Sequence, residues 1–85
     1  FMGSPKSKFF DVSREASKDI VEEEMDKIVE KLAVLEMIIC AGKDEDFDIN
    51  QYIKDYTLDN MAEVNAMKKG LYVEFTGDII SRLDS

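Results

Sequence analysis

Side chains that could bind calcium stand at alternate positions from residue 44, namely Asp44, Asp46, Asp48 and Asn50, and the twelfth position is Asp55. An EF-hand loop places its oxygen ligands at positions 1, 3, 5, 7, 9 and 12. The sixth position is Ile49, where the loop needs glycine for its sharp turn, and the twelfth carries Asp instead of the usual bidentate Glu. We therefore expect no metal and no other cofactor at this segment.

The same residues fit the start of a helix better than they fit a calcium-binding loop. Asp48 and Gln51 have the spacing of a capping box, with Asp48 as the N-cap and Gln51 three residues later. Phe47 and Tyr52 flank the box at the positions of a hydrophobic staple. This pattern predicts that a helix begins after Asp48, which is incompatible with a calcium loop over the same residues.

Basic and aromatic residues occur together near the N-terminus, at Lys6, Lys8, Phe9 and Phe10. Such an arm could stack on a nucleotide-like anion or on a partner. In that case we expect Tyr52 and Tyr72 to complete the ligand site between subunits. The alternative, which we favour, is that the two phenylalanines pack on the start of a helix while the lysines stay in water.

The residue types present exclude most familiar catalytic chemistry. The chain has no histidine and one cysteine, so Ser-His-Asp and Cys-His catalysis and cysteine-rich zinc sites are all absent. No pair of carboxylates, lysines or tyrosines has a spacing that singles it out as an acid and base. We therefore expect that the protein is not an enzyme.

The net charge of −8, from 19 acidic and 11 basic residues, restricts the partners. A duplex nucleic acid or an anionic membrane surface requires a basic face, so neither is expected to bind directly. The ordinary interpretation is a hydrated acidic surface. The more specific alternative is that the acidic surface mimics a nucleic acid and blocks the basic groove of a nucleic-acid enzyme. The acidic partner face would consist of Glu22, Glu23, Glu24, Asp26, Asp44, Glu45 and Asp46.

The chain is organised around the segment from Asp11 to Gly42, which reads as one long helix capped by Asp11 or Ser13. Apolar residues recur in steps of four and three, which defines a heptad seam. After residue 32 the helix is apolar on nearly every side, so it must be buried on every side, including the thiol of Cys40. The seam residues are Val21, Met25, Ile28, Leu32, Leu35 and Ile39.

A helix of this length is too long for a compact monomer. About 30 helical residues span roughly 45 Å, whereas a globule of 85 residues is about 30 Å across, from a radius of gyration of roughly 12 Å. We therefore expect that the uncovered part of the heptad seam binds a second copy of the chain. The alternative is a helical hairpin whose second helix covers the seam.

The C-terminal part allows two structures. Residues 71–75 alternate as in a strand, and Gly77 with Asp78 could turn a β-hairpin over residues 71–83. However, Leu71, Phe75 and Ile79 are also four residues apart, as on a helix. An isolated hairpin is only marginally stable, so we favour a helix. A second helix start follows closely after residue 56, capped by Thr57 or, in a competing capping box, by Asn60.

These observations predict an all-α fold: a long helix, a short capped helix and a second long helix folding back antiparallel, oligomerised through the heptad seam. Residues 1–5 read as a cloning remnant and residues 6–85 as one small helical domain. The N-terminal ten residues lack an apolar segment, so we expect no signal peptide and a cytoplasmic location. The favoured function is a non-enzymatic protein that self-associates and binds or inhibits another protein.

Overall fold

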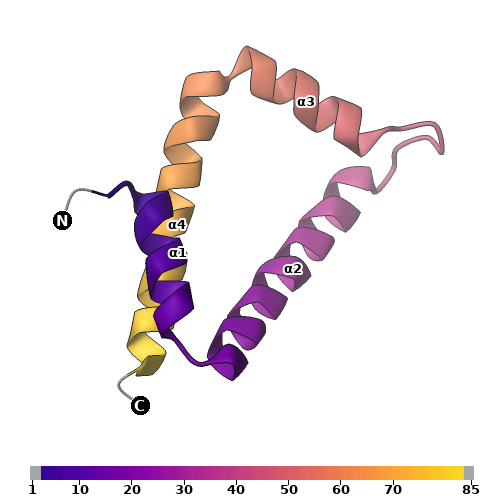
Figure 1. The fold of residues 1–85 in the computed structure, drawn as a ribbon. Helices are drawn as coiled ribbons and strands as arrows, with labels where there is room; N and C mark the ends of the chain where they lie inside the picture. Colours follow the sequence, from indigo (N-terminus) through magenta and orange to yellow (C-terminus); the bar gives the residue numbers. More distant parts are fainter. Residues whose placement is uncertain (1–2, 84–85) are drawn as a thin grey trace.

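The computed structural model describes residues 3–83, which form four helices and no strand (Figure 1). The all-α prediction is therefore confirmed, and the alternative of a β-hairpin over residues 71–83 is wrong. The helices are α1 (Pro5–Glu15), α2 (Lys18–Cys40), α3 (Ile49–Asp59) and α4 (Met61–Leu83).

The prediction of one helix from Asp11 to Gly42 is wrong, because the chain breaks between α1 and α2. Ala16 is extended, and Ser17 caps α2 by accepting a hydrogen bond from the amide of Ile20. Ser13 does not act as a cap, because its hydroxyl donates to the carbonyl of Phe9 inside α1. A serine placed after the first apolar cluster thus starts a new helix, and the chain reverses direction there.

Helix α1 begins earlier than predicted. Its N-cap is Ser4, whose hydroxyl accepts from the amide of Ser7, and Pro5 fills the first helical position, where a missing N–H has no cost. Of the segment interpreted as a cloning remnant, residues 1 and 2 lie outside the described part. Ser4 and Pro5 are structural parts of the first helix.

The connection between α2 and α3 agrees with the prediction made from the sequence. Helix α2 stops at Cys40, and Gly42 takes the left-handed conformation, with φ of 77°. Asp48 caps α3 by accepting from the amides of Asn50 and Gln51. The rings of Phe47 and Tyr52 lie 5.7 Å apart, so the predicted staple is confirmed. The helix occupies the residues that a calcium loop would need.

Helices α3 and α4 meet at Asn60, with no intervening loop. Thr57 is not a cap, since it lies inside α3 and donates to the carbonyl of Ile53. Helix α4 then runs without a break through Gly70 and Gly77. Neither glycine has a positive φ, and a methyl group added to either would meet no atom within 4 Å. The two glycines therefore weaken α4 locally without ending it.

The small core lies where α1 packs along the C-terminal part of α4. Phe9 is only 5% exposed, and its ring lies 5.4 Å from that of Tyr72 and 6.4 Å from that of Phe75. Ile79 is fully buried beside them. These contacts explain why residues 71–83 are helical: the four-residue spacing brings Phe75 and Ile79 to one face, which α1 covers.

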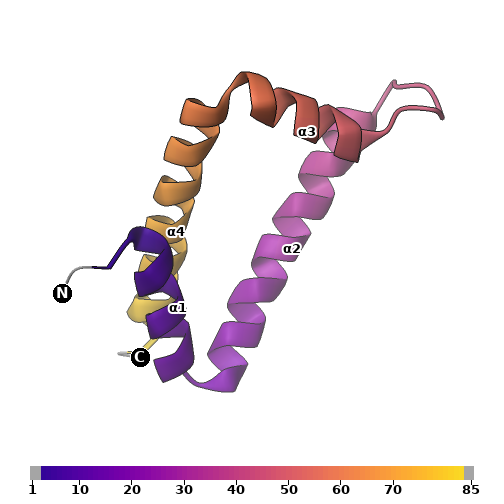
Figure 2. The same cartoon turned by 45° about the horizontal axis from the view of Figure 1, so that its top comes forward.

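Helices α2, α3 and α4 form an open frame, by which we mean three sides joined at their ends. Helices α2 and α4 run antiparallel, as predicted, but they approach each other only near the start of α2 and then diverge, while α3 spans their far ends (Figures 1 and 2). The radius of gyration is 15.7 Å, against roughly 12 Å for a compact chain of this length. The second long helix therefore covers only part of the heptad seam.

Candidate functional site

Four charged side chains join α2 to α4 where the two helices approach. Arg82 donates one hydrogen bond of 2.9 Å to Glu24 and another of 2.5 Å to Glu23. Lys27 donates to the same oxygen of Glu24, also at 2.9 Å. The prediction that Glu24 faces water is wrong, because its side chain is enclosed between the helices and only 5% of the residue is exposed.

These contacts keep Glu24 ionised. The hydrogen bond from Lys27 and the bonds from Arg82 lower the pKa of Glu24 below its ordinary value, although burial opposes them. A general acid or base works best with a pKa near the operating pH, and a carboxylate held by two cations is shifted the opposite way. The arrangement therefore suits a structural ion pair that fixes the angle between α2 and α4.

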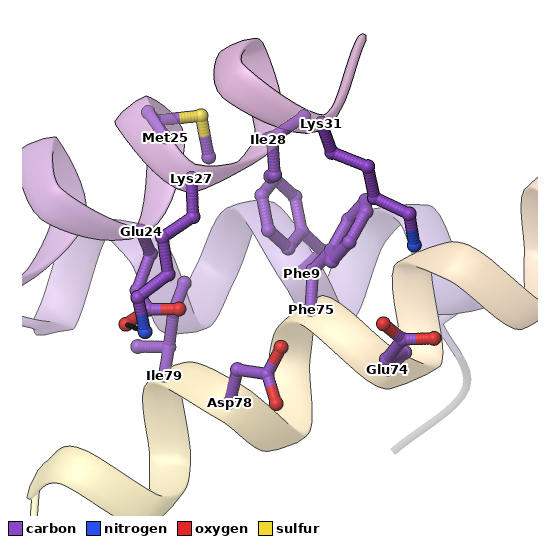
Figure 3. A pocket seen from close by; sticks show the side chains of 10 residues that line it. All are labelled: Phe9, Glu24, Met25, Lys27, Ile28, Lys31, Glu74, Phe75, Asp78 and Ile79. Atoms are coloured by element: carbon purple, nitrogen blue, oxygen red, sulfur yellow. Dashed lines mark hydrogen bonds and ion pairs between the residues drawn. The ribbon is translucent and has the colours of Figure 1, made fainter. Parts of the chain in front are cut away.

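A small cavity of about 110 Å³ lies beside this ion pair, between α2 and α4 (Figure 3). Phe9 and Phe75 close it on one side, and Met25 and Ile28 of α2 reach it from the other. This volume is well below the roughly 300 Å³ at which pockets for small molecules begin. The cavity is thus a packing gap at the narrow end of the open frame.

The heptad seam is divided between two environments. Its first half, Val21, Met25 and Ile28, is partly buried at the junction with α1 and α4. Its second half, Leu32, Leu35 and Ile39, is exposed. The structure therefore leaves three of the six seam residues open to solvent, at the part of α2 that leaves α4.

The exposed half of the seam is surrounded by further apolar side chains. Val34, Met37 and Ile38 lie on the other sides of the same helical segment, and Met37 is 73% exposed. The expectation that this segment is buried on every side is not met within one chain. Cys40, predicted to be buried, is an exposed thiol at the end of α2.

The acidic residues that would form a nucleic-acid mimic lie at the two ends of α2. Glu22, Glu23 and Glu24 stand near the start of α2 and have cationic partners, Lys18 for Glu22 and Arg82 for the other two. Asp44, Glu45 and Asp46 follow the opposite end of the same helix, which at 1.5 Å per residue is about 35 Å long. The acidic residues thus form two separate groups.

The basic and aromatic arm becomes part of α1. Phe9 is buried in the core, so its ring has no open face for a ligand, whereas Phe10 is 43% exposed. Lys6 and Lys8 are exposed. Tyr72 packs against both phenylalanine rings, but Tyr52 belongs to α3 and pairs with Phe47 instead. The two tyrosines are therefore not brought together in one chain.

Two residues that matter for the fold, Arg82 and Ser17, were not predicted from the sequence. Arg82 is one charged residue among many, and only the fold places it against Glu23 and Glu24 from 58 positions away. Ser17 could have been found, because a serine followed by an acidic first turn is typical of a helix start. No glycine or proline accompanies it, since residues 11–41 contain neither.

Residues 3–83 contain neither a cluster of metal ligands nor a membrane-spanning helix. Within this range, no three or more cysteine, aspartate and glutamate side chains gather closely enough to hold a metal ion. Each helix of the same range is too short or too polar to span a lipid bilayer.

The fold and its exposed seam define a small acidic all-α protein with an incomplete core. The chain belongs to the family described as "Domain of unknown function (DUF2018)", whose model matches residues 1–84. The match covers nearly the whole chain and so includes all four helices. The chain matches no curated protein and no solved structure.

Proposed function

We propose that this protein is a non-enzymatic helical module that self-associates through the exposed half of the heptad seam, and that the assembled form binds or inhibits another protein. The observation that carries the proposal is the apolar end of α2, where Leu32, Leu35 and Ile39 are exposed together with their apolar neighbours. Contiguous exposed apolar surface of this kind marks interaction sites in water-soluble domains.

The exposed area supports the same conclusion. The single chain has 6851 Å² of accessible surface, whereas a compact protein of 9.7 kDa has about 5,100 Å². The excess of about 1,700 Å² per chain is what one subunit contributes to a large, apolar homodimer interface, for which the two subunits together bury about 2,000 to 5,000 Å². If a second copy covered the open frame, the accessible surface per chain would fall to about that of a compact protein of the same mass.

Light scattering coupled to size-exclusion chromatography, at low and high salt, tests the self-association. We expect a dimer or larger species that persists at high salt, because apolar contacts are not screened. The variant Leu35→Asp introduces a charge at the centre of the exposed seam and should shift the protein towards monomer. A wild-type monomer at every concentration would overturn the proposal.

Val73→Asp provides the matched control. Val73 is an apolar residue of α4 that is 59% exposed, and it lies outside the heptad seam. The same substitution there should leave the mass of the assembly unchanged. If Val73→Asp dissociates the assembly and Leu35→Asp does not, the interface lies on α4 and our assignment to the seam is wrong.

The partner of the assembly and its location complete the proposal. A single cysteine with an exposed thiol is suited to a reducing compartment, so we place the protein in the cytoplasm. Cross-linking of the wild-type assembly in cell extract, with Leu35→Asp as the comparison, tests for a protein partner. Capture by the wild type alone would support an assembly-dependent partner, and equal capture by both forms would place the partner on another surface.

A further inference from the structure

Three lysines surround one hollow at the start of α1. The hollow has a volume of about 280 Å³ and lies between the first turn of α1 and the middle of α4. Lys6 reaches it from α1, and Lys68 and Lys69 reach it from α4. The other residues that line it are Ser4, Pro5, Asn65 and Tyr72. None of the lining residues is a carboxylate.

The neighbouring hollow extends this basic region. It has a volume of about 480 Å³, shares Ser4 and Pro5 with the first, and is lined by a fourth lysine, Lys8, and by apolar side chains of α4. Among the residues that the structure describes, its lining also contains no carboxylate. The chain has 19 acidic and 11 basic residues, yet the described lining of these two adjoining hollows contains four lysines and no carboxylate. Positive charge is therefore concentrated in this region of an acidic protein.

Within residues 3–83, the ion pairs of the structure use Arg14, Lys18, Lys27 and Arg82. The four lysines of the two hollows form no such pair there, a property that they share with Lys31, Lys43 and Lys54. Each of the four is exposed. The lysine side chains are the charged groups in the two linings, so an anion is the ligand that this region would attract.

From these observations we propose that the hollow lined by Lys6, Lys68 and Lys69 binds a small polyphosphate anion. Lysine is a common phosphate ligand because its ammonium group is a compact charge with three donors. The amide of Asn65 supplies a neutral donor beside the lysines. Ser4 is not counted as a ligand, since its hydroxyl already caps α1. The lining of this hollow shares no residue with the heptad seam.

The size of the hollow limits the ligand. Pockets for small molecules commonly measure about 300 to 1,000 Å³, and the first hollow alone is close to the lower limit. A chain of two or three phosphates fits this volume, and its charge is opposite to that of the lysines. The ring of Tyr72 is already packed against Phe9 and Phe10, so we expect recognition of the phosphates rather than stacking of a base.

Titration of the ¹⁵N-labelled protein with inorganic tripolyphosphate, followed by NMR, tests the proposal. We expect saturable shifts confined to the amides of residues 4–8 and 65–72. Replacing both lysines of α4, as Lys68→Gln with Lys69→Gln, should weaken binding at least about tenfold, because each hydrogen bond to a charged group contributes measurably to affinity. ATP should bind about as tightly as tripolyphosphate.

A second double variant controls for net charge. Lys31→Gln with Lys54→Gln removes two exposed lysines elsewhere in the chain, and glutamine is as good a helix former as lysine. This control should bind tripolyphosphate within about twofold of the wild type. Equal weakening by the two double variants, or no saturable shift with the wild type, would overturn the proposal. Shifts spread over all lysines would also overturn it.

Discussion

Phe9 and Phe10 are adjacent and chemically identical, yet the fold gives them different roles. Phe9 points into the contact between α1 and α4, beside Phe75 and Ile79, and Phe10 stays 43% exposed. Removing a buried phenylalanine side chain costs about 3 to 5 kcal/mol. We expect Phe9→Ala to lower the free energy of unfolding by about this amount, measured by urea denaturation at fixed protein concentration. Phe10→Ala is the control and should cost less than half as much.

The ionisation of Glu24 makes the free energy of unfolding depend on pH. Its pKa is lowered in the folded protein by Lys27 and Arg82, so its contribution to stability is present above the unfolded pKa of about 4.5 and is lost as the pH falls through the folded value. We expect Glu24→Gln to be less stable than the wild type at pH 7, and the difference to shrink below about pH 4.5. Thermal unfolding at a series of pH values measures this.

The control for Glu24 is Glu30, an exposed side chain of the same helix. Exposed surface substitutions usually change stability by no more than about 0.5 kcal/mol, so Glu30→Gln should stay close to the wild type at pH 7. A difference between Glu24→Gln and the wild type that grows on acidification would contradict the role assigned to the ion pair.

At the scale of elements, a glycine in the interior of α4 lowers the stability of that helix. Gly70 is exposed in the helix interior with open space around its α-carbon. Gly70→Ala should stabilise the protein by roughly 0.5 to 1 kcal/mol, because alanine loses less backbone entropy in a helix. Thermal unfolding should show a rise of a few degrees. A clear loss of stability would mean that another chain approaches α4 at this residue in the assembly.

The break between α1 and α2 depends on a single cap. Ser17→Ala removes the oxygen that accepts from the amide of Ile20 and should cost about 1 kcal/mol. Ser13→Ala is the control, because that hydroxyl donates to a carbonyl within α1 that already has a helical partner. Urea denaturation compares the two, and an equal effect would show that the cap is not the cause of the break.

At the scale of the whole molecule, the open frame ties stability to association. If a second copy covers the apolar end of α2, unfolding and dissociation are coupled, and the unfolding midpoint must rise with protein concentration. We expect this rise for the wild type and its loss for Leu35→Asp. Differential scanning calorimetry over a wide concentration range measures it, and a constant wild-type midpoint would contradict the coupling.

The sequence alone determined the helical class, the end of α2 and the start of α3. These features depend on local chemistry: Gly42 in a left-handed conformation, and the cap at Asp48 with the staple of Phe47 and Tyr52. The exclusion of histidine-based catalysis also needs only the list of residues. Such signals involve only four or five consecutive residues, so they can be recognised without knowledge of the fold.

The tertiary structure decided everything that joins distant residues. The four-residue spacing in residues 71–83 became a helix because α1 covers it, and Glu24 became a buried ion-pair partner because α4 brings Arg82 to it. Residues 11–41 contain neither glycine nor proline, so the strongest breaker signals were missing at the reversal near Ala16 and Ser17, and only the packing of α1 on α4 shows where the chain turns back. The meeting of Lys6 with Lys68 and Lys69 likewise depends on the packing of α1 against α4, which no local pattern encodes.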